Sequence, residues 1–138
     1  MRTTRDSFLH LFIDNIVGVP VHNVRRDLNN PSAALYQVNA LNIKFLETMP
    51  GANIGNTTVE LAVINEDELT ALAWVKKVYD ILNAAYVLKK MSYTNPAAPV
   101  PVGQSQVWWG YDLMFKSVYS ESYYDYRCQM TLYHLIDS

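Results

Sequence analysis

Two runs of alternating apolar and polar residues on either side of a glycine-containing loop constrain the fold of this chain most. Within residues 37–48 large apolar side chains recur at every second position from Leu41 to Phe45, and within residues 58–63 they do so from Val59 to Val63. A period of two places these side chains on one face of a β-strand. The sequence therefore predicts an antiparallel hairpin with one buried face, formed by Leu41, Ile43, Phe45, Val59, Leu61 and Val63.

The loop between the two runs, in "TMPGANIGNTTVEL" at residues 48–61, superficially matches a phosphate-binding loop. That motif reads G-x-x-x-x-G-K-[ST] and lies between a strand and a helix. Here Gly51 and Gly55 enclose three residues, Asn56 stands at the lysine position, and a strand is predicted to follow. Without the lysine and a helix N-terminus, little remains to hold a phosphate. We interpret the loop as a hairpin connection, and we predict no nucleotide site.

Two other segments have the period of amphipathic helices. The first covers residues 4–17 and ends before Gly18. The second is "NEDELTALAWVKKVYDILN", in which Asn65 is expected to cap the helix, with Glu68 three residues further on. Its apolar residues form two stripes, Leu69, Leu72, Val75, Tyr79 and Leu82 in one and Trp74, Val78 and Ile81 in the other. Because they cover more than half of the circumference, we expect this helix to contact the sheet and either the first helix or another subunit.

The rest of the chain is rich in further strand patterns. Residues 85–94 read as a third strand, residues 95–106 as a proline-rich surface loop, and residues 107–119 and 123–136 as two long strands. The predicted fold is therefore α+β, with a mostly antiparallel β-sheet of about five strands flanked by two helices. The expected order is α-β-β-α-β-β-β, in a single domain over residues 1–138.

The residue types that carry chemistry are few and badly spaced. Cys128 is the single cysteine, and it lies six positions from His134 in one predicted strand, about 20 Å away at the usual rise per residue. We expect Cys128 to be a buried small hydrophobic residue, and His134 to be a semi-buried histidine with its hydrogen bonds satisfied rather than a ligand. His10 and His22 have no metal-ligand spacing. The sequence thus predicts no catalytic residue, no metal and no cofactor.

Charge and hydropathy limit the possible partners. Only 17% of the residues are charged, below the roughly 25% of ordinary soluble chains, which favours an oligomer. The net charge is −2 with no basic stripe, which argues against tight binding of nucleic acid. No apolar run approaches the roughly 20 residues that span a bilayer, and the N-terminus does not read as a signal peptide. We expect a soluble protein of intracellular origin without membrane contact.

The layout as a whole resembles a known family. The hairpin "VNALNIKFLETMPGANIGNTTVELAVI", the helix that follows it and the final segment "VWWGYDLMFKSVYS" are similar in length, order and texture to tail terminator proteins of long-tailed bacteriophages, which are also called tail completion or neck proteins. The resemblance implies a structural virion protein that is assembled in the host cytoplasm. It implies a homo-hexameric ring that caps the tail tube protein and joins it to the head connector or adaptor protein. DNA would pass through the lumen without specific binding, and no functional residue is assigned by the resemblance.

The ring interpretation needs apolar contact residues, and the sequence offers five. Met49 and Ile54 are apolar residues near an expected exposed loop tip, which turn formation does not explain. Trp74 and Val78 lie on the second stripe of the central helix, and Trp108 lies in the aromatic strand. We predict these five as partner contacts.

Other functions stay open at this point. One alternative is a small-ligand or carbohydrate-binding module with an aromatic platform of Trp108, Trp109, Tyr123 and Tyr124. Another is a different structural protein of the tail or baseplate. A hydrolase of unrecognised type would need a pocket that brings a histidine or carboxylate pair together, which no spacing requires.

Overall fold

A computed structural model describes residues 2–24, 35–49, 54–84, 87–92, 100–108 and 114–135 of the chain. Two helices and seven strands lie in these ranges. The helices are α1 (Arg2–Asn15) and α2 (Glu68–Ala84). The strands are β1 (Val21–Asn23), β2 (Ala40–Met49), β3 (Ile54–Asn65), β4 (Val87–Ser92), β5 (Val100–Trp108), β6 (Lys116–Val118) and β7 (Tyr124–Leu135). The α+β class is thereby confirmed.

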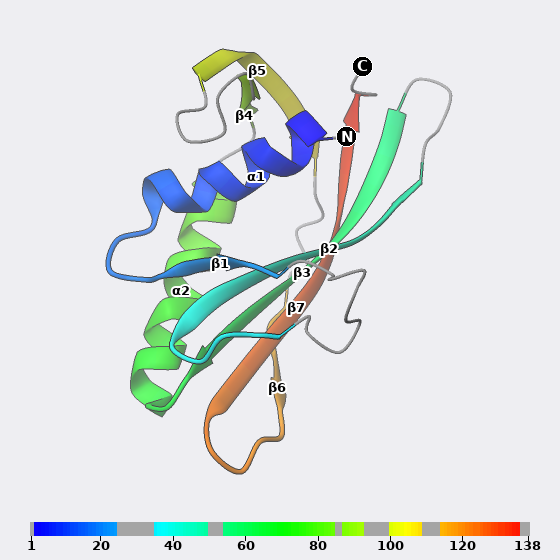
Figure 1. Cartoon of the computed structure of the whole chain (residues 1–138). Coiled ribbons are helices and arrows are strands. Elements are labelled where there is room, and N and C mark those ends of the chain that lie inside the picture. The colour runs from blue at the N-terminus through cyan, green and yellow to red at the C-terminus, as the bar shows by residue number, and fades with distance from the viewer. Residues whose placement is uncertain are drawn as a thin grey trace.

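The predicted hairpin is present and forms the centre of the sheet. β2 and β3 pair antiparallel, with Leu41 opposite Val63, Ile43 opposite Leu61 and Phe45 opposite Val59. β7 pairs antiparallel with the other side of β3 along its whole length (Figure 1). Just past Phe45 the register shifts by one residue, so that Leu46 is the extra residue of a β-bulge. The alternation of the sequence therefore predicted both the pairing and the buried face.

The prediction of a mostly antiparallel sheet needs a correction, because the sheet is mixed. β1 runs parallel to β2, with Val21 opposite Leu41. The Leu41 N–H donates to the Pro20 carbonyl at 2.8 Å, and the Val24 N–H donates to the Ile43 carbonyl at 2.9 Å. The sequence analysis predicted no strand here, because three residues are too few to show alternation. The order of elements is accordingly α-β-β-β-α-β-β-β-β, and the order of strands across the sheet is β1-β2-β3-β7-β5-β4, with β6 also pairing with β7.

The strand prediction for residues 107–119 and the loop prediction for residues 95–106 were also wrong. β5 occupies most of the expected loop and ends at Trp108. Pro101 is accommodated there because it pairs with Met91 at an irregularity in the β4–β5 register, where a missing backbone N–H costs little.

The expected long strand is interrupted because its two ends pair with β7 in different registers. Trp108 pairs with Tyr133, and Lys116 pairs with Arg127. These two residues are eight positions apart, whereas their partners are six apart, so one regular strand cannot make both pairings. β6 therefore contains only three residues of the predicted strand.

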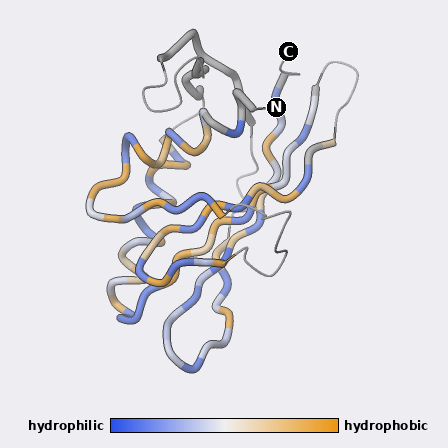
Figure 2. Tube along the Cα trace, in the orientation of Figure 1, coloured by the Kyte–Doolittle hydropathy of each residue, from blue (hydrophilic) through white to orange (hydrophobic). Residues whose placement is uncertain are grey.

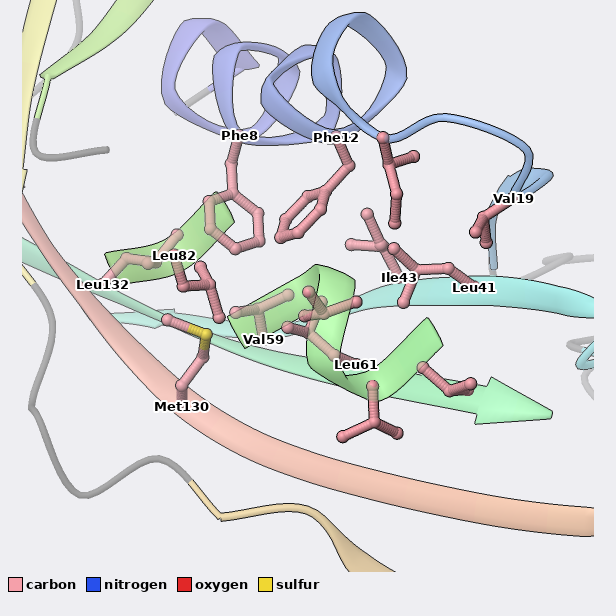
Figure 3. Packing of buried hydrophobic residues seen from close by; sticks show 14 of the residues in the cluster. Phe8, Phe12, Val19, Leu41, Ile43, Val59, Leu61, Leu82, Met130 and Leu132 are labelled. Atoms are coloured by element: carbon pink, nitrogen blue, oxygen red, sulfur yellow. The ribbon is translucent and has the colours of Figure 1, made fainter. Parts of the chain in front are cut away.

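Both helices pack on the same face of the sheet, and together they bury its apolar side. Figure 3 shows Phe8 and Phe12 pointing from α1 toward the strands, where their rings meet edge to face with centroids 5.3 Å apart. Figure 2 shows hydrophobic residues recurring along α1 and alternating with hydrophilic ones along the central strands. The buried cluster comprises Phe8, Phe12, Ile16, Val19, Leu41, Ile43, Val59, Leu61, Val63, Ala71, Val75, Val78, Leu82, Met130 and Leu132.

Side-chain hydrogen bonds cap the start of α2 and connect α2 to the chain just after α1. α2 is capped by Asp67 rather than by Asn65, because the Asp67 carboxylate accepts the Thr70 N–H at 2.9 Å and the Thr70 hydroxyl at 2.6 Å. Asn65 instead accepts the N–H of Asp67 in the preceding turn, at 2.8 Å. Beyond the end of α1, Lys77 of α2 donates to the Val17 carbonyl at 2.8 Å, which ties the two helices together.

The cap makes the stability of α2 depend on pH. The side-chain and backbone hydrogen bonds from Thr70 lower the pKa of Asp67 below its ordinary value of about 4. A lowered folded-state pKa means that the carboxylate stabilises the fold above the unfolded-state pKa and loses this effect as the pH falls through the folded-state pKa. Asp67→Ala should therefore lower the free energy of unfolding at pH 7. Urea titrations at several pH values should show that this difference from the wild type shrinks once the pH falls below about 4.

Asp67→Asn is the matched control for this test. An asparagine oxygen can still accept the Thr70 N–H, so this variant should keep part of the cap without its pH dependence. A difference between Asp67→Ala and the wild type that is equal at pH 7 and pH 3 would contradict the assigned cap.

Candidate functional site

Two of the candidates for nucleophile or base chemistry, Cys128 and His134, are buried in the sheet, whereas His10 on α1 and His22 on β1 are only partly buried. Cys128 lies on β7 on the face that packs against the helices, and burial raises the pKa of its thiol. A protonated, buried thiol is a poor nucleophile. His134 is fully buried, with its Nε2 2.9 Å from the Thr57 hydroxyl. Within the described ranges, no three histidine, cysteine or carboxylate side chains lie close enough together to hold a metal ion.

A cluster of charged and aromatic side chains occupies the opposite face of the sheet. Lys44 of β2, Glu60 of β3 and Arg127 of β7 alternate with core residues, so the strand pleat directs them away from the helices. Tyr36, from the chain just before β2, reaches over this face and donates its hydroxyl proton to a carboxylate oxygen of Glu60. Asp125 of β7 completes what we call the Tyr36 cluster.

Arg127 is the centre of the Tyr36 cluster. Its guanidinium carbon lies 4.3 Å from the centroid of the Tyr36 ring, and the Lys44 amine lies 5.8 Å from the same centroid. Its Nε and Nη2 each donate to a carboxylate oxygen of Asp125 at 3.0 Å, and Nη1 is 3.7 Å from Glu60. The hydrogen bonds to the buried Asp125 contribute most to raising the pKa of Arg127.

The electrostatics of the Tyr36 cluster indicate that it attaches a segment of the chain to the sheet. Burial, followed by the hydrogen bond to Glu60, raises the pKa of Tyr36, so its hydroxyl stays protonated. The buried side chain of Asn42 adds to the attachment, because it accepts the Gln37 N–H at 2.7 Å and donates to the Gln37 carbonyl at 2.9 Å. The cluster therefore holds the segment at residues 35–39 on the open face of the sheet.

A hollow of about 420 Å³ lies inside the β6–β7 hairpin. Its lining consists of Glu66 and residues 117–124, which include three tyrosines. Tyr123 and Tyr124 of the alternative aromatic platform belong to this lining, but Trp108 pairs with Tyr133, nine positions along β7 from Tyr124. Trp109 lies outside the described residues. The described strands thus do not bring the proposed platform together.

The five predicted partner contacts have different positions in the fold. Met49 ends β2 and is 58% exposed, and Ile54 begins β3 opposite Leu135. Trp74 is half-buried against the core. The backbone of Trp108 pairs with that of Tyr133, and the side chains of Ile54 and Trp108 lie outside the described residues. Among the predicted contacts whose side chains the structure describes, Met49 is well exposed.

The prediction of Val78 as a partner contact was wrong, because this side chain is fully buried in the core. The stripe of α2 that faces the sheet contains Ala71, Val75, Val78 and Leu82. Leu69 and Leu72, which the sequence analysis placed on one stripe with Val75 and Leu82, are 78% and 43% exposed. An apolar pattern that covers more than half of a helix does not show which side faces the sheet.

The sequence analysis did not single out several exposed apolar residues, among them Leu46 and Tyr133. Leu46 is 40% exposed on β2, and Tyr133 is 47% exposed on β7. The break in alternation at Leu46–Glu47 is the signal that could have revealed the bulge and its exposed leucine.

No protein-family model matches the sequence, and no curated protein matches it either. In the part of the chain that the structure describes, neither helix combines the length and the apolar character that crossing a membrane requires.

The Tyr36 cluster makes a specific prediction about stability. Arg127→Met should lower the free energy of unfolding by about 3 kcal/mol, because it leaves the buried carboxylate of Asp125 without its partner. Adding Asp125→Asn should restore part of this loss by removing the unpaired charge. Lys44→Met, which removes only a distant cation from the Tyr36 ring, is the control and should cost less than about 1 kcal/mol. Equal effects of the two methionine variants in urea unfolding would contradict the central role of Arg127.

Proposed function

We propose that this chain is a structural subunit of the neck of a long-tailed bacteriophage. It forms a homo-hexameric ring that caps the tail tube and joins the tail to the head connector, without catalysis. In this proposal, residues 1–138 act as one tail-terminator-like α+β domain, which is assembled in the host cytoplasm and becomes part of the virion.

The observation that carries the proposal is an extension of the β2–β3 hairpin that ends with the exposed side chain of Met49. Phe45 still contacts α1, since its ring lies 6.2 Å from that of Phe8 and 5.7 Å from the guanidinium carbon of Arg5. Beyond Phe45, β2 and β3 continue to Met49 and Ile54, and Figure 1 draws this end of the hairpin standing away from both helices. An exposed methionine at the end of such an extension is suited to an apolar partner surface, because methionine adapts to irregular contacts.

The electrostatics are also consistent with this role. Most of the charge in the Tyr36 cluster is paired internally, and the whole chain has a net charge of −2. A ring of such subunits would not hold DNA through its phosphates, which need clustered cations. DNA could then pass through the lumen without being retained.

In this proposal, the tip of the β2–β3 hairpin contacts the tail tube protein and performs no chemistry. The double variant Met49→Ser/Ile54→Ser should fold and form rings like the wild type. It should bind tail tube protein about tenfold or more weakly, on the scale of losing central apolar contacts in an interface. Light scattering measures the ring, and co-sedimentation with assembled tail tubes measures the binding.

Tyr119→Ser is the matched control, because it removes an exposed apolar side chain at the other end of the sheet, in the β6–β7 connection. This variant should bind tubes normally. Normal tube binding and tail joining by the Met49→Ser/Ile54→Ser variant would remove the docking role. Binding of the wild-type ring to tubes, but not to the head connector, would favour another tail or baseplate position.

A further inference from the structure

We infer that the hollow inside the β6–β7 hairpin is a binding site for a guanidinium group. This inference goes beyond the proposed function and does not rest on it. Figure 1 draws the β6–β7 connection at the bottom of the molecule, whereas the end of the β2–β3 hairpin with Met49 stands at the upper right. A ligand in the hollow would therefore lie at the other end of the sheet from the proposed contact with the tail tube.

Strand pairing fixes the walls of this hollow. The lining comes from the end of β6, the connection to β7, the start of β7, and Glu66, which follows β3. Tyr124 of β7 pairs with Asn65 of β3, and the Glu66 N–H donates to the side-chain oxygen of Asn39 at 3.1 Å. The volume of about 420 Å³ lies in the lower part of the range of roughly 300–1,000 Å³ that small-molecule sites occupy. The hollow therefore has room for a small ligand or for one side chain of a partner.

The lining combines negative charge with aromatic rings. Glu66 and Glu121 are both exposed, and in the part of the chain that the structure describes neither takes part in an ion pair. The lining also contains three tyrosines and three serines, and none of its described residues is a lysine or an arginine. Lys116, which precedes the lining in sequence, pairs with Arg127 of β7. A lining with two carboxylates and no basic side chain attracts a cation and repels an anion.

The Tyr36 cluster shows which kind of cation suits these side chains. There the guanidinium carbon of Arg127 lies 4.3 Å from the centroid of the Tyr36 ring, and the same group donates to Asp125 at 3.0 Å. The carboxylate of Glu60 is 3.7 Å from it. The hollow presents the same kinds of group, tyrosine rings and two carboxylates. A planar guanidinium can stack on a ring and bond a carboxylate through two N–H groups, whereas an ammonium group is more strongly hydrated and has no planar face. The geometry therefore favours a guanidinium over an ammonium ligand.

A matched pair of probes tests the class of ligand. N-acetyl-arginine amide and N-acetyl-citrulline amide have nearly the same shape, but the citrulline side chain is uncharged. In NMR titrations of the isotope-labelled protein at low salt, the arginine probe should shift the amide resonances of Glu66 and residues 117–124. The citrulline probe should bind about tenfold or more weakly, because it lacks the charge. The δ-methylene protons of the bound arginine probe should move upfield, because stacking places them over a tyrosine ring.

A third probe separates the two sources of this group, a small free compound and an arginine of a partner protein. Methylguanidine contains the guanidinium without the peptide-like part of the arginine probe. Equal affinity of methylguanidine and the arginine probe would assign the hollow to a small free compound. Tighter binding of the arginine probe would assign it to an arginine within a protein. Both results support the guanidinium class.

The double variant Glu66→Gln/Glu121→Gln removes both charges and keeps the shape of the hollow. It should fold like the wild type and bind the arginine probe about tenfold or more weakly. The control is Glu47→Gln/Glu68→Gln, which removes two exposed carboxylates that do not line the hollow. Because Glu68 is only two positions from Glu66, unchanged binding by this control would separate direct contact from a general attraction to the acidic start of α2.

Four results would overturn the site: no shift with the arginine probe, equal binding of the arginine and citrulline probes, shifts confined to residues outside the lining, or normal binding by the Glu66→Gln/Glu121→Gln variant. None of these results bears on the proposed function, because ring formation and tube binding by the wild type are measured without any guanidinium compound. Conversely, a wild type that forms no ring can still bind the arginine probe.

Discussion

The fold depends on the burial of one face of the β2–β3–β7 sheet beneath α1 and α2. Phe8 and Phe12 from α1, and Val78 and Leu82 from α2, fill the space above the apolar side of these strands. Burial of such side chains stabilises a domain by roughly 1.5–3 kcal/mol for each one. Because both helices occupy the same face, the other face of the sheet remains for other contacts. The Tyr36 cluster covers part of that second face, and Met49 and Tyr133 are exposed beyond it.

The sequence predicted the elements in which local pattern and tertiary contact agree. Alternation over residues 37–48 and 58–63 was sufficient to pair β2 with β3, because a shift by one residue would have exposed every core side chain. β1 could not be recognised, since its three residues pair with β2 only through the path that the chain takes after α1. β5 was hidden by Pro101, which the irregular pairing with β4 accommodates. These misses reflect long-range pairing, which no local pattern encodes.

The candidate contacts were harder to predict than the fold. Val78 and Leu72 are both apolar residues of one amphipathic helix, and only the position of the sheet decides which is buried and which is exposed. The Tyr36 cluster joins residues from β2, β3, β7 and the chain before β2, so no sequence spacing could indicate it. Met49 was predicted as a partner contact because turn formation does not require an apolar residue beside the turn. Sequence reasoning therefore singled out Met49 as an exposed apolar residue, while the exposed side of α2 required the structure.

We propose that this chain acts by forming a closed ring that meets a tube. The most direct measurement is the mass of the wild-type protein by light scattering over a wide concentration range, alone and with assembled tail tube protein. A ring-forming neck subunit should give one discrete multimer, either alone or on the tube end. This multimer should co-sediment with tubes and stop their growth. A protein that remains a monomer at every concentration, and stays in the supernatant when tubes are added, would contradict it.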